Sequence, residues 1–203
     1  MIGFFDALKE ARGIPVTARP RRVPMSFHSL ALVLERGRAV KKKVLVGSKP
    51  LVPATDEAKA CGYEVSLLDR VMKARPVSPR KKKDQNGGNT TSGPSSGSET
   101  SVPQRLVEQA VDEILHLKML ESLIDAQKPA TIVLATGDAA EAEYSGGFLK
   151  MVERALEKGW KVELVSFKRN MSYAYRQKPF RQKWTGKFKL IFLDDYREEL
   201  LDL

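Results

Sequence analysis

Two hydrophobic patterns alternate along this chain: short apolar runs, and longer stretches with apolar residues three or four positions apart. The clearest example is 131–167, where the run 132–135 is typical of a buried strand in a parallel sheet. A helix is predicted from Phe148, because apolar residues then recur on one face, and Gly159 marks its expected end. The run 160–165 predicts the next strand. This succession predicts an α/β fold with a parallel sheet.

The same patterns predict most of the remaining elements. Helices are expected at 2–12, 26–34, 55–60, 106–126 and 196–201, and strands at 40–46, 63–68, 132–135, 160–165 and 187–193. Ser26 and Thr55 are expected to cap their helices, because short polar side chains can accept a hydrogen bond from the first free backbone N–H groups. Gly37 is expected to end the helix that begins after Ser26.

One stretch, 76–103, shows neither pattern. It contains a basic run at 80–83 and a tract of Gly, Ser, Asn and Thr, with too few apolar residues to offset the entropy of ordering it. We therefore expect a disordered insert that divides one domain into an N-terminal half, 1–75, and a C-terminal half, 104–203. The basic run is compatible with a phosphate-binding patch, a nuclear-import signal or a solvated tether.

Composition narrows the class of partner. The 203 residues suit one domain, and a net charge of +10 with a pI near 9.7 favours polyanions, with nucleic acid ahead of a membrane surface. No apolar run approaches the length of a membrane span, so no membrane contact is expected. Cys61 is the only cysteine, which excludes a disulfide framework and favours an intracellular location, in the cytoplasm or the nucleus.

An acidic loop follows the strand at 132–135. Asp138, Glu141 and Glu143 lie there with no basic residue before Phe148. Ligands of parallel sheets bind beyond the carboxyl ends of the strands, and clustered carboxylates without a cation favour binding of a divalent ion. The alternative is a solvated acidic loop.

Asp112 is a second candidate, because the helix that carries it precedes this strand and could bring its carboxylate into the same crevice. It shares a helix face with His116, four residues later. The alternative is an aspartate on the helix surface. Ser145 lies in no nucleophile-elbow motif and has no obvious partner histidine, so serine hydrolysis is not expected.

The segment after Phe167 combines cations with aromatic rings and contains no acidic residue up to Leu193. Cations bind phosphates and aromatic faces stack on unpaired bases, so the segment predicts binding of single-stranded RNA or DNA. The candidate RNA-binding residues are Lys168, Arg169, Tyr173, Tyr175, Arg176, Lys178 and Arg181. Some of the aromatic residues must be core, and Phe180 or Trp184 is expected there.

The sequence around these candidates resembles a known family. The segments LATGD at 134–138 and GFLKMVERALEKGWKV at 147–162, with the helix start at Val111 and Asp112, are similar to a NYN domain of fungal type, within the PIN-like ribonucleases. The resemblance implies a Rossmann-like, three-layer α/β fold with a mostly parallel central sheet. It also implies catalytic roles for Asp112 and Asp138, which would bind Mg²⁺ or Mn²⁺ and cut RNA with metal-activated water.

Two departures from the family pattern qualify this expectation. Gly147 stands where the family has a second aspartate, so Glu141 or Glu143 is expected to substitute as a metal ligand. The family also begins with a strand that ends in an aspartate and leads into the helix found here at 2–12. We therefore expect that the first strand and its carboxylate are missing and that the chain does not cleave RNA in this form. A non-catalytic RNA-binding module and a protein-interaction scaffold remain alternatives.

Overall fold

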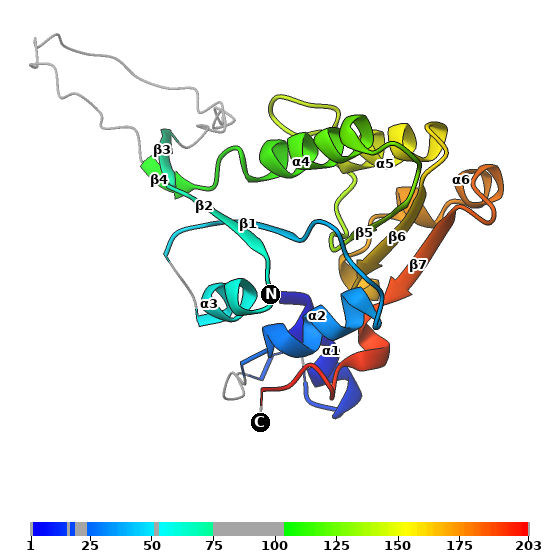
Figure 1. Ribbon diagram of the computed structural model, residues 1–203. Helices are drawn as coiled ribbons and strands as arrows, with labels where there is room; N and C mark the ends of the chain where they lie inside the picture. Colours follow the sequence, from blue (N-terminus) through cyan, green and yellow to red (C-terminus); the bar gives the residue numbers. More distant parts are fainter. Residues whose placement is uncertain (1, 16, 19–23, 51–52, 75–103, 203) are drawn as a thin grey trace, which may run out of the picture.

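The computed structural model describes residues 2–15, 17–18, 24–50, 53–74 and 104–202 and shows a mixed α/β fold with parallel sheets (Figure 1). The insert predicted at 76–103 lies outside the described residues. The helices are α1 (Ile2–Ala11), α2 (Phe27–Glu35), α3 (Pro53–Ala60), α4 (Val111–Asp125), α5 (Gly147–Glu157) and α6 (Lys178–Lys183). The short 3₁₀ segments are η1 (Lys168–Asn170), η2 (Tyr173–Arg176) and η3 (Leu193–Tyr196).

The strands form three separate sheets in the described part of the chain. β5 (Thr131–Leu134), β6 (Lys161–Ser166) and β7 (Phe188–Phe192) make a parallel sheet in that spatial order. β1 (Val44–Ser48) and β2 (Glu64–Leu68) make a second parallel sheet, and β3 (Val71–Ala74) pairs with β4 (Gln104–Val107) in a two-stranded antiparallel sheet. The pairing is mostly parallel as expected, but it is divided between two sheets and does not form one central sheet.

Helices cover both faces of the three-stranded sheet (Figure 1). Val162 and Leu164 of β6 pack into the same core as α4 and α5, whereas Val165 packs with residues of α1 and α2 on the other face. Alternate residues of a strand point to opposite faces, so a strand buried on both sides is apolar at nearly every position. This explains why β6 carries apolar residues for both faces, at Val162, Leu164 and Val165, although Lys161, Glu163 and Ser166 are polar.

Several predicted elements are confirmed. α5 buries Phe148, Met151, Val152, Ala155 and Leu156 on one face. The Ser26 hydroxyl accepts a hydrogen bond of 3.2 Å from the backbone N–H of Ser29 and caps α2 as predicted. Trp184 is buried and Phe180 packs against the same core, as expected for at least one of them.

Three sequence-based predictions are wrong. Thr55 does not cap α3, which begins two residues earlier at Pro53; proline suits the first helical position because its missing N–H would have no helical partner. Leu106 and Val107 belong to β4, because β3 offers them strand partners, and the long helix begins only at Val111. The terminal helix predicted at 196–201 is not formed: the 3₁₀ segment η3 ends at Tyr196, and residues 197–200 form turns.

Within the described residues, none of the helices combines the length and the apolar character needed to cross a bilayer.

The core at β6 provides a test of the fold. Leu164 is fully buried, whereas Leu117 on α4 is 54% exposed. Leu164→Ala is expected to lower the free energy of unfolding by about 2–5 kcal/mol, because it removes buried methyl groups and leaves a cavity. Leu117→Ala makes the same chemical change at an exposed position and is expected to cost less than about 1 kcal/mol. Urea denaturation of both variants measures the difference, and equal losses would contradict this packing.

Candidate functional site

The loop after β5 holds the backbone of Asp138 in a fixed position. The Asp138 carbonyl accepts a hydrogen bond of 2.8 Å from the Tyr175 hydroxyl. The Asp138 N–H donates to the Thr136 hydroxyl at 3.2 Å, and its carboxylate accepts from the Ala140 N–H at 2.8 Å. The side chain itself is exposed. The sequence therefore places an accessible carboxylate on an anchored backbone, just beyond the carboxyl end of β5.

Gly137 makes this anchoring possible. A Cβ atom at this position would lie 2.3 Å from the Asn170 carbonyl oxygen, in the segment that follows β6. The Ser172 N–H also donates to the Gly137 carbonyl at 2.8 Å. Only a residue without a side chain lets the two segments approach this closely. The loop after β5 is thus held against the segment after β6.

Asp112 lies in the first turn of α4. The charges of several other acidic side chains act on its carboxylate. Burial is the largest influence and raises the pKa of Asp112, the neighbouring His116 lowers it, and the charge of Asp138 raises it further. Glu113 and Glu108 act in the same direction as Asp138. In the folded chain the charge of Asp138 therefore acts on the Asp112 carboxylate, although 26 positions separate the two residues in sequence.

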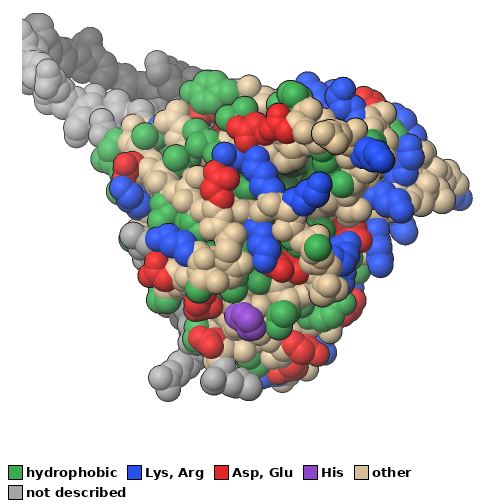
Figure 2. Space-filling model, in the orientation of Figure 1, with side chains coloured by type: hydrophobic (Ala, Val, Ile, Leu, Met, Phe, Trp, Pro, Cys, Tyr) green, Lys and Arg blue, Asp and Glu red, His purple; other side chains and the backbone are tan. Residues whose placement is uncertain are grey.

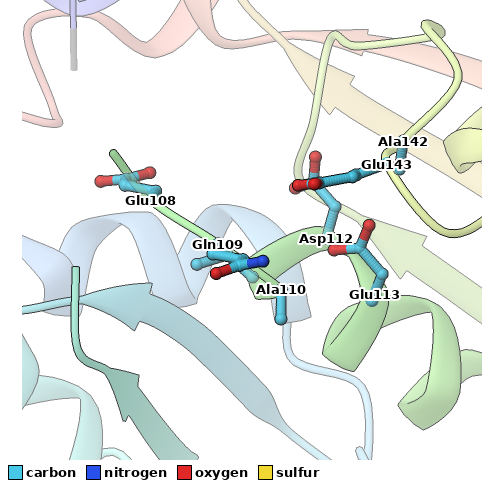
Figure 3. Close-up of a pocket in the computed structure, with 8 residues that line it drawn as sticks. Glu108, Gln109, Ala110, Asp112, Glu113, Ala142 and Glu143 are labelled. Atoms are coloured by element: carbon cyan, nitrogen blue, oxygen red, sulfur yellow. The ribbon is translucent and has the colours of Figure 1, made fainter. Parts of the chain in front are cut away.

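A hollow of about 180 Å³ adjoins Asp112. It is lined by Glu108, Gln109, Ala110, Val111, Asp112, Glu113, Ala142 and Glu143. Figure 3 shows Asp112, Glu113 and Glu143 gathered on one side of this hollow, with Glu108 on the other side. The Glu113 carboxylate accepts a hydrogen bond of 3.2 Å from the Tyr144 N–H and so ties the acidic loop to α4.

Sequence reasoning missed Glu108 and Glu113. For Glu113 the signal was its position beside Asp112, in the first turn of the same helix. Glu108 follows β4, a segment in which the sequence pattern predicted a helix. That pattern therefore gave no indication that Glu108 lies at the hollow.

The two glutamates proposed as substitute ligands lie in different surroundings. Glu143 forms an ion pair with Lys73 of β3 at 2.5 Å and accepts a hydrogen bond of 3.1 Å from the Tyr144 hydroxyl. The bond from Lys73, followed by that from Tyr144, lowers the pKa of Glu143. This corrects the expectation that the loop has no compensating cation. Glu141 is exposed and is not among the residues that line the hollow.

Ser145 does have a partner histidine, contrary to the sequence-based expectation. A hydrogen bond of 2.8 Å joins its hydroxyl to Nδ1 of His116, and the hydroxyl also accepts from the Gly147 N–H at 3.3 Å. Burial lowers the pKa of His116, which favours the neutral ring, and Phe148 packs edge-on against it. Nε2 of His116 is buried without a hydrogen-bond partner in the described residues, so no carboxylate orients the ring as in a catalytic triad. The pair instead connects the acidic loop to α4.

The donor set allows only a sparse metal site. Among the described residues, no group of three or more His, Cys, Asp or Glu side chains is arranged to hold a metal ion. Two carboxylates still suit Mg²⁺ chemically, because this ion retains several waters and is commonly bound by one or two carboxylates together with a substrate phosphate. Asp112 and Asp138 fit that description, since neither forms an ion pair within the described ranges.

The predicted RNA-binding segment is only partly exposed. Tyr175 is fully buried, and its hydroxyl is used by the Asp138 carbonyl, so it cannot stack on a base; burial, the largest influence, raises its pKa. The sequence could not show this, because cations surround the tyrosine on both sides. Tyr173 is 70% exposed and keeps its ring available.

The cations of the same segment fall into two groups. Lys168 pairs with Asp195 at 3.6 Å, and Arg169 pairs with Asp6 at 3.5 Å. Arg176 donates to the Met171 carbonyl at 3.3 Å. Lys178 and Arg181 are exposed and form no ion pair with the part of the chain that the structure describes.

No protein-family model matches the chain, and no curated protein matches it.

The raised pKa of Asp112 predicts a pH-dependent stability. The carboxylate ionises at higher pH in the folded protein than in the unfolded chain, so its contribution to stability falls as the pH rises through this interval. Asp112→Asn is therefore expected to raise the melting temperature at pH 7 in EDTA and to lose this advantage below about pH 4. Asp125→Asn, on the exposed end of α4, is the matched control and should change stability little. Thermal melts over this pH range would contradict the argument if Asp112→Asn destabilised the protein at pH 7.

The contact between Tyr175 and Asp138 gives a separate prediction. Tyr175→Phe keeps the buried ring but removes the hydroxyl donor, and it is expected to cost about 0.5–1.5 kcal/mol of stability. Tyr173→Phe removes an exposed hydroxyl two residues away and should cost almost nothing. Chemical denaturation compares the two variants. An unchanged Tyr175→Phe protein would show that this hydrogen bond does not hold the loop.

Proposed function

We propose that this chain is a metal-dependent ribonuclease domain of the NYN type that acts on single-stranded RNA. The observation that carries the proposal is the pairing of Asp112 with Asp138. The two carboxylates come from different elements, lie in one electrostatic neighbourhood and form no ion pair within the described residues. Repulsion between unpaired carboxylates is relieved when a divalent cation binds between them.

The residues around the pair set its geometry before a ligand binds. Tyr175 fixes the main chain at Asp138, and α4 fixes Asp112 in its first turn. Both carboxylates would bind the ion in their ionised form. When bound, Mg²⁺ or Mn²⁺ supplies activation of a water molecule at neutral pH and neutralisation of charge on the phosphate. Tyr144 is held to α4 through Glu113, which keeps the acidic loop beside the pair.

The surface charge supports an RNA substrate. The chain carries a net charge of +10, which attracts a polyanion. Tyr173 exposes its ring at the same end of the sheet as Asp138, and such a ring can stack on an unpaired base. Unpaired bases are accessible in single strands and buried in A-form duplexes, which favours a single-stranded substrate.

A second candidate is a non-catalytic RNA-binding module. It is favoured by the absence, within the described residues, of a third acidic ligand beside Asp112 and Asp138. In this case exposed cations such as Lys178 and Arg181 would bind RNA, and Asp112 and Asp138 would have no catalytic role.

Cleavage of a single-stranded RNA in Mn²⁺ distinguishes the two candidates. The nuclease should cut the RNA, contrary to the inactive chain expected from the family pattern, because two carboxylates together with a substrate phosphate can bind Mg²⁺. Asp112→Asn and Asp138→Asn should each reduce the rate about 100-fold or more, because even residues behind metal ligands often contribute 10- to 100-fold. Asp125→Asn is the control and should retain activity. Calorimetry with Mn²⁺ alone provides the second measurement, in which either substitution in the pair should weaken binding. RNA that is bound but not cut, with Mn²⁺ affinities equal in all variants, would reject the nuclease and favour the module.

A further inference from the structure

We propose that the RNA backbone is bound at the amino end of the three-stranded sheet, on the side away from Asp138. This inference rests on the proposed function, because it locates the surface that binds the same RNA. The surface consists of Lys158, Lys161, Arg181, Lys183 and Lys187, and is called the amino-end patch below.

The topology brings these cations together from three parts of the chain. Lys161 is the first residue of β6, and Lys187 directly precedes β7. The two strands are parallel and in register, with Val162 opposite Phe188, so Lys161 and Lys187 are neighbours. The Lys187 carbonyl also accepts a hydrogen bond of 2.9 Å from the Val162 N–H. Lys158 follows the end of α5, only three residues before Lys161.

Helix α6 adds the remaining two cations. Its Phe180 packs against Tyr175 and Phe188, which holds the helix beside β7. The Lys183 ammonium lies 4.6 Å from the centre of the Trp184 ring, and this cation–π contact orients it at the surface. Figure 1 shows α6 at the end of the molecule where β6 and β7 begin, and Figure 2 shows Lys and Arg side chains grouped along that edge.

The charge of this patch is not compensated by neighbouring acids. All five side chains are exposed, and none forms an ion pair with any described residue. Glu157 lies beside Lys158 in sequence, but the two side chains form no ion pair. At the opposite end of the sheet, by contrast, Lys168 and Arg169 are paired with acidic side chains. A phosphate there must compete with Asp195 and Asp6, whereas a phosphate at the amino-end patch displaces only water and counterions.

The chemistry of the patch fits a sugar–phosphate backbone. No large apolar side chain is exposed among its residues, so it offers nothing to insert into a bilayer and no ring to stack on a base. Cations alone bind phosphates without reading sequence. β6 contains six residues, so roughly 20 Å separates the two ends of the sheet. The RNA backbone is therefore bound at one end of the sheet, and the RNA reaches Asp112 and Asp138 at the other end.

Fluorescence anisotropy with a labelled 20-nucleotide oligouridine tests this location. The patch variant, Lys161→Gln with Lys183→Gln and Lys187→Gln, is expected to bind at least about 10-fold more weakly at 100 mM salt. The slope of log affinity against log salt concentration should fall by about 2, since each lost phosphate contact contributes about 0.7 for a single strand. The control variant, Arg12→Gln with Lys49→Gln and Lys59→Gln, removes the same charge from cations that are already paired elsewhere and should change affinity less than about twofold.

A third variant, Lys168→Gln with Arg169→Gln and Arg176→Gln, tests the competing location and should weaken binding less than the patch variant. If it weakens binding as much or more, the amino-end location is wrong while RNA binding stands. If the unaltered chain does not bind the RNA even at low salt, the proposed function fails and this inference fails with it. Equal displacement of the RNA by a polyglutamate peptide of the same length would overturn RNA as the partner of this surface.

Discussion

The close contact between the loop after β5 and the segment after β6 is the constraint on which the candidate site depends. Gly137 lets the two backbones approach, and Ser172 and Tyr175 then fix them with hydrogen bonds to consecutive carbonyl groups. These bonds use the backbone of Asp138, while its carboxylate accepts a hydrogen bond from the Ala140 N–H and stays exposed. Because Tyr175 belongs to the same core as α5 and β7, the position of Asp138 is coupled to the packing of the whole sheet.

The second half of the site depends on how the two parallel sheets are connected. α4 packs on α5, which covers the three-stranded sheet, and it also contacts β1 of the other sheet. Its first turn, which carries Asp112, is therefore positioned by both sheets. The hydrogen bond between Ser145 and His116, and that from the Tyr144 N–H to Glu113, then attach the acidic loop to the same helix. Packing and these hydrogen bonds thus join the helix that carries Asp112 to the loop that follows Asp138.

The sequence identified the parts of this site whose signals are local. A β-branched run followed by an acidic loop and an amphipathic helix is enough to locate Asp138 at a strand end. The assignments that failed depend on distant partners: Leu106 and Val107 have spacing compatible with a helix, and only their pairing with Val71 and Met72 makes them a strand. Likewise, Lys73 lies 70 positions from Glu143, so no local pattern reveals that this glutamate is neutralised. Tyr175 looks like a surface residue because Arg176 follows it in a segment rich in cations, yet its ring is part of the core.

The distribution of paired and unpaired charges carries more information than the net charge of +10. Most acidic side chains near the sheet have a partner from the chain itself: Glu163 of β6 pairs with Arg36 and Arg38, and Glu143 pairs with Lys73. Burial opposes ionisation of Glu163, but the two arginines outweigh it and lower its pKa. For Asp112, burial and the charges of Asp138, Glu113 and Glu108 outweigh the effect of His116, and its pKa is raised. Asp112 and Asp138 form no ion pair with any described residue, and cations that also form none lie at the opposite end of the same sheet, so both regions can receive opposite charges from outside. A divalent cation bound to a polyanion supplies both charges at once.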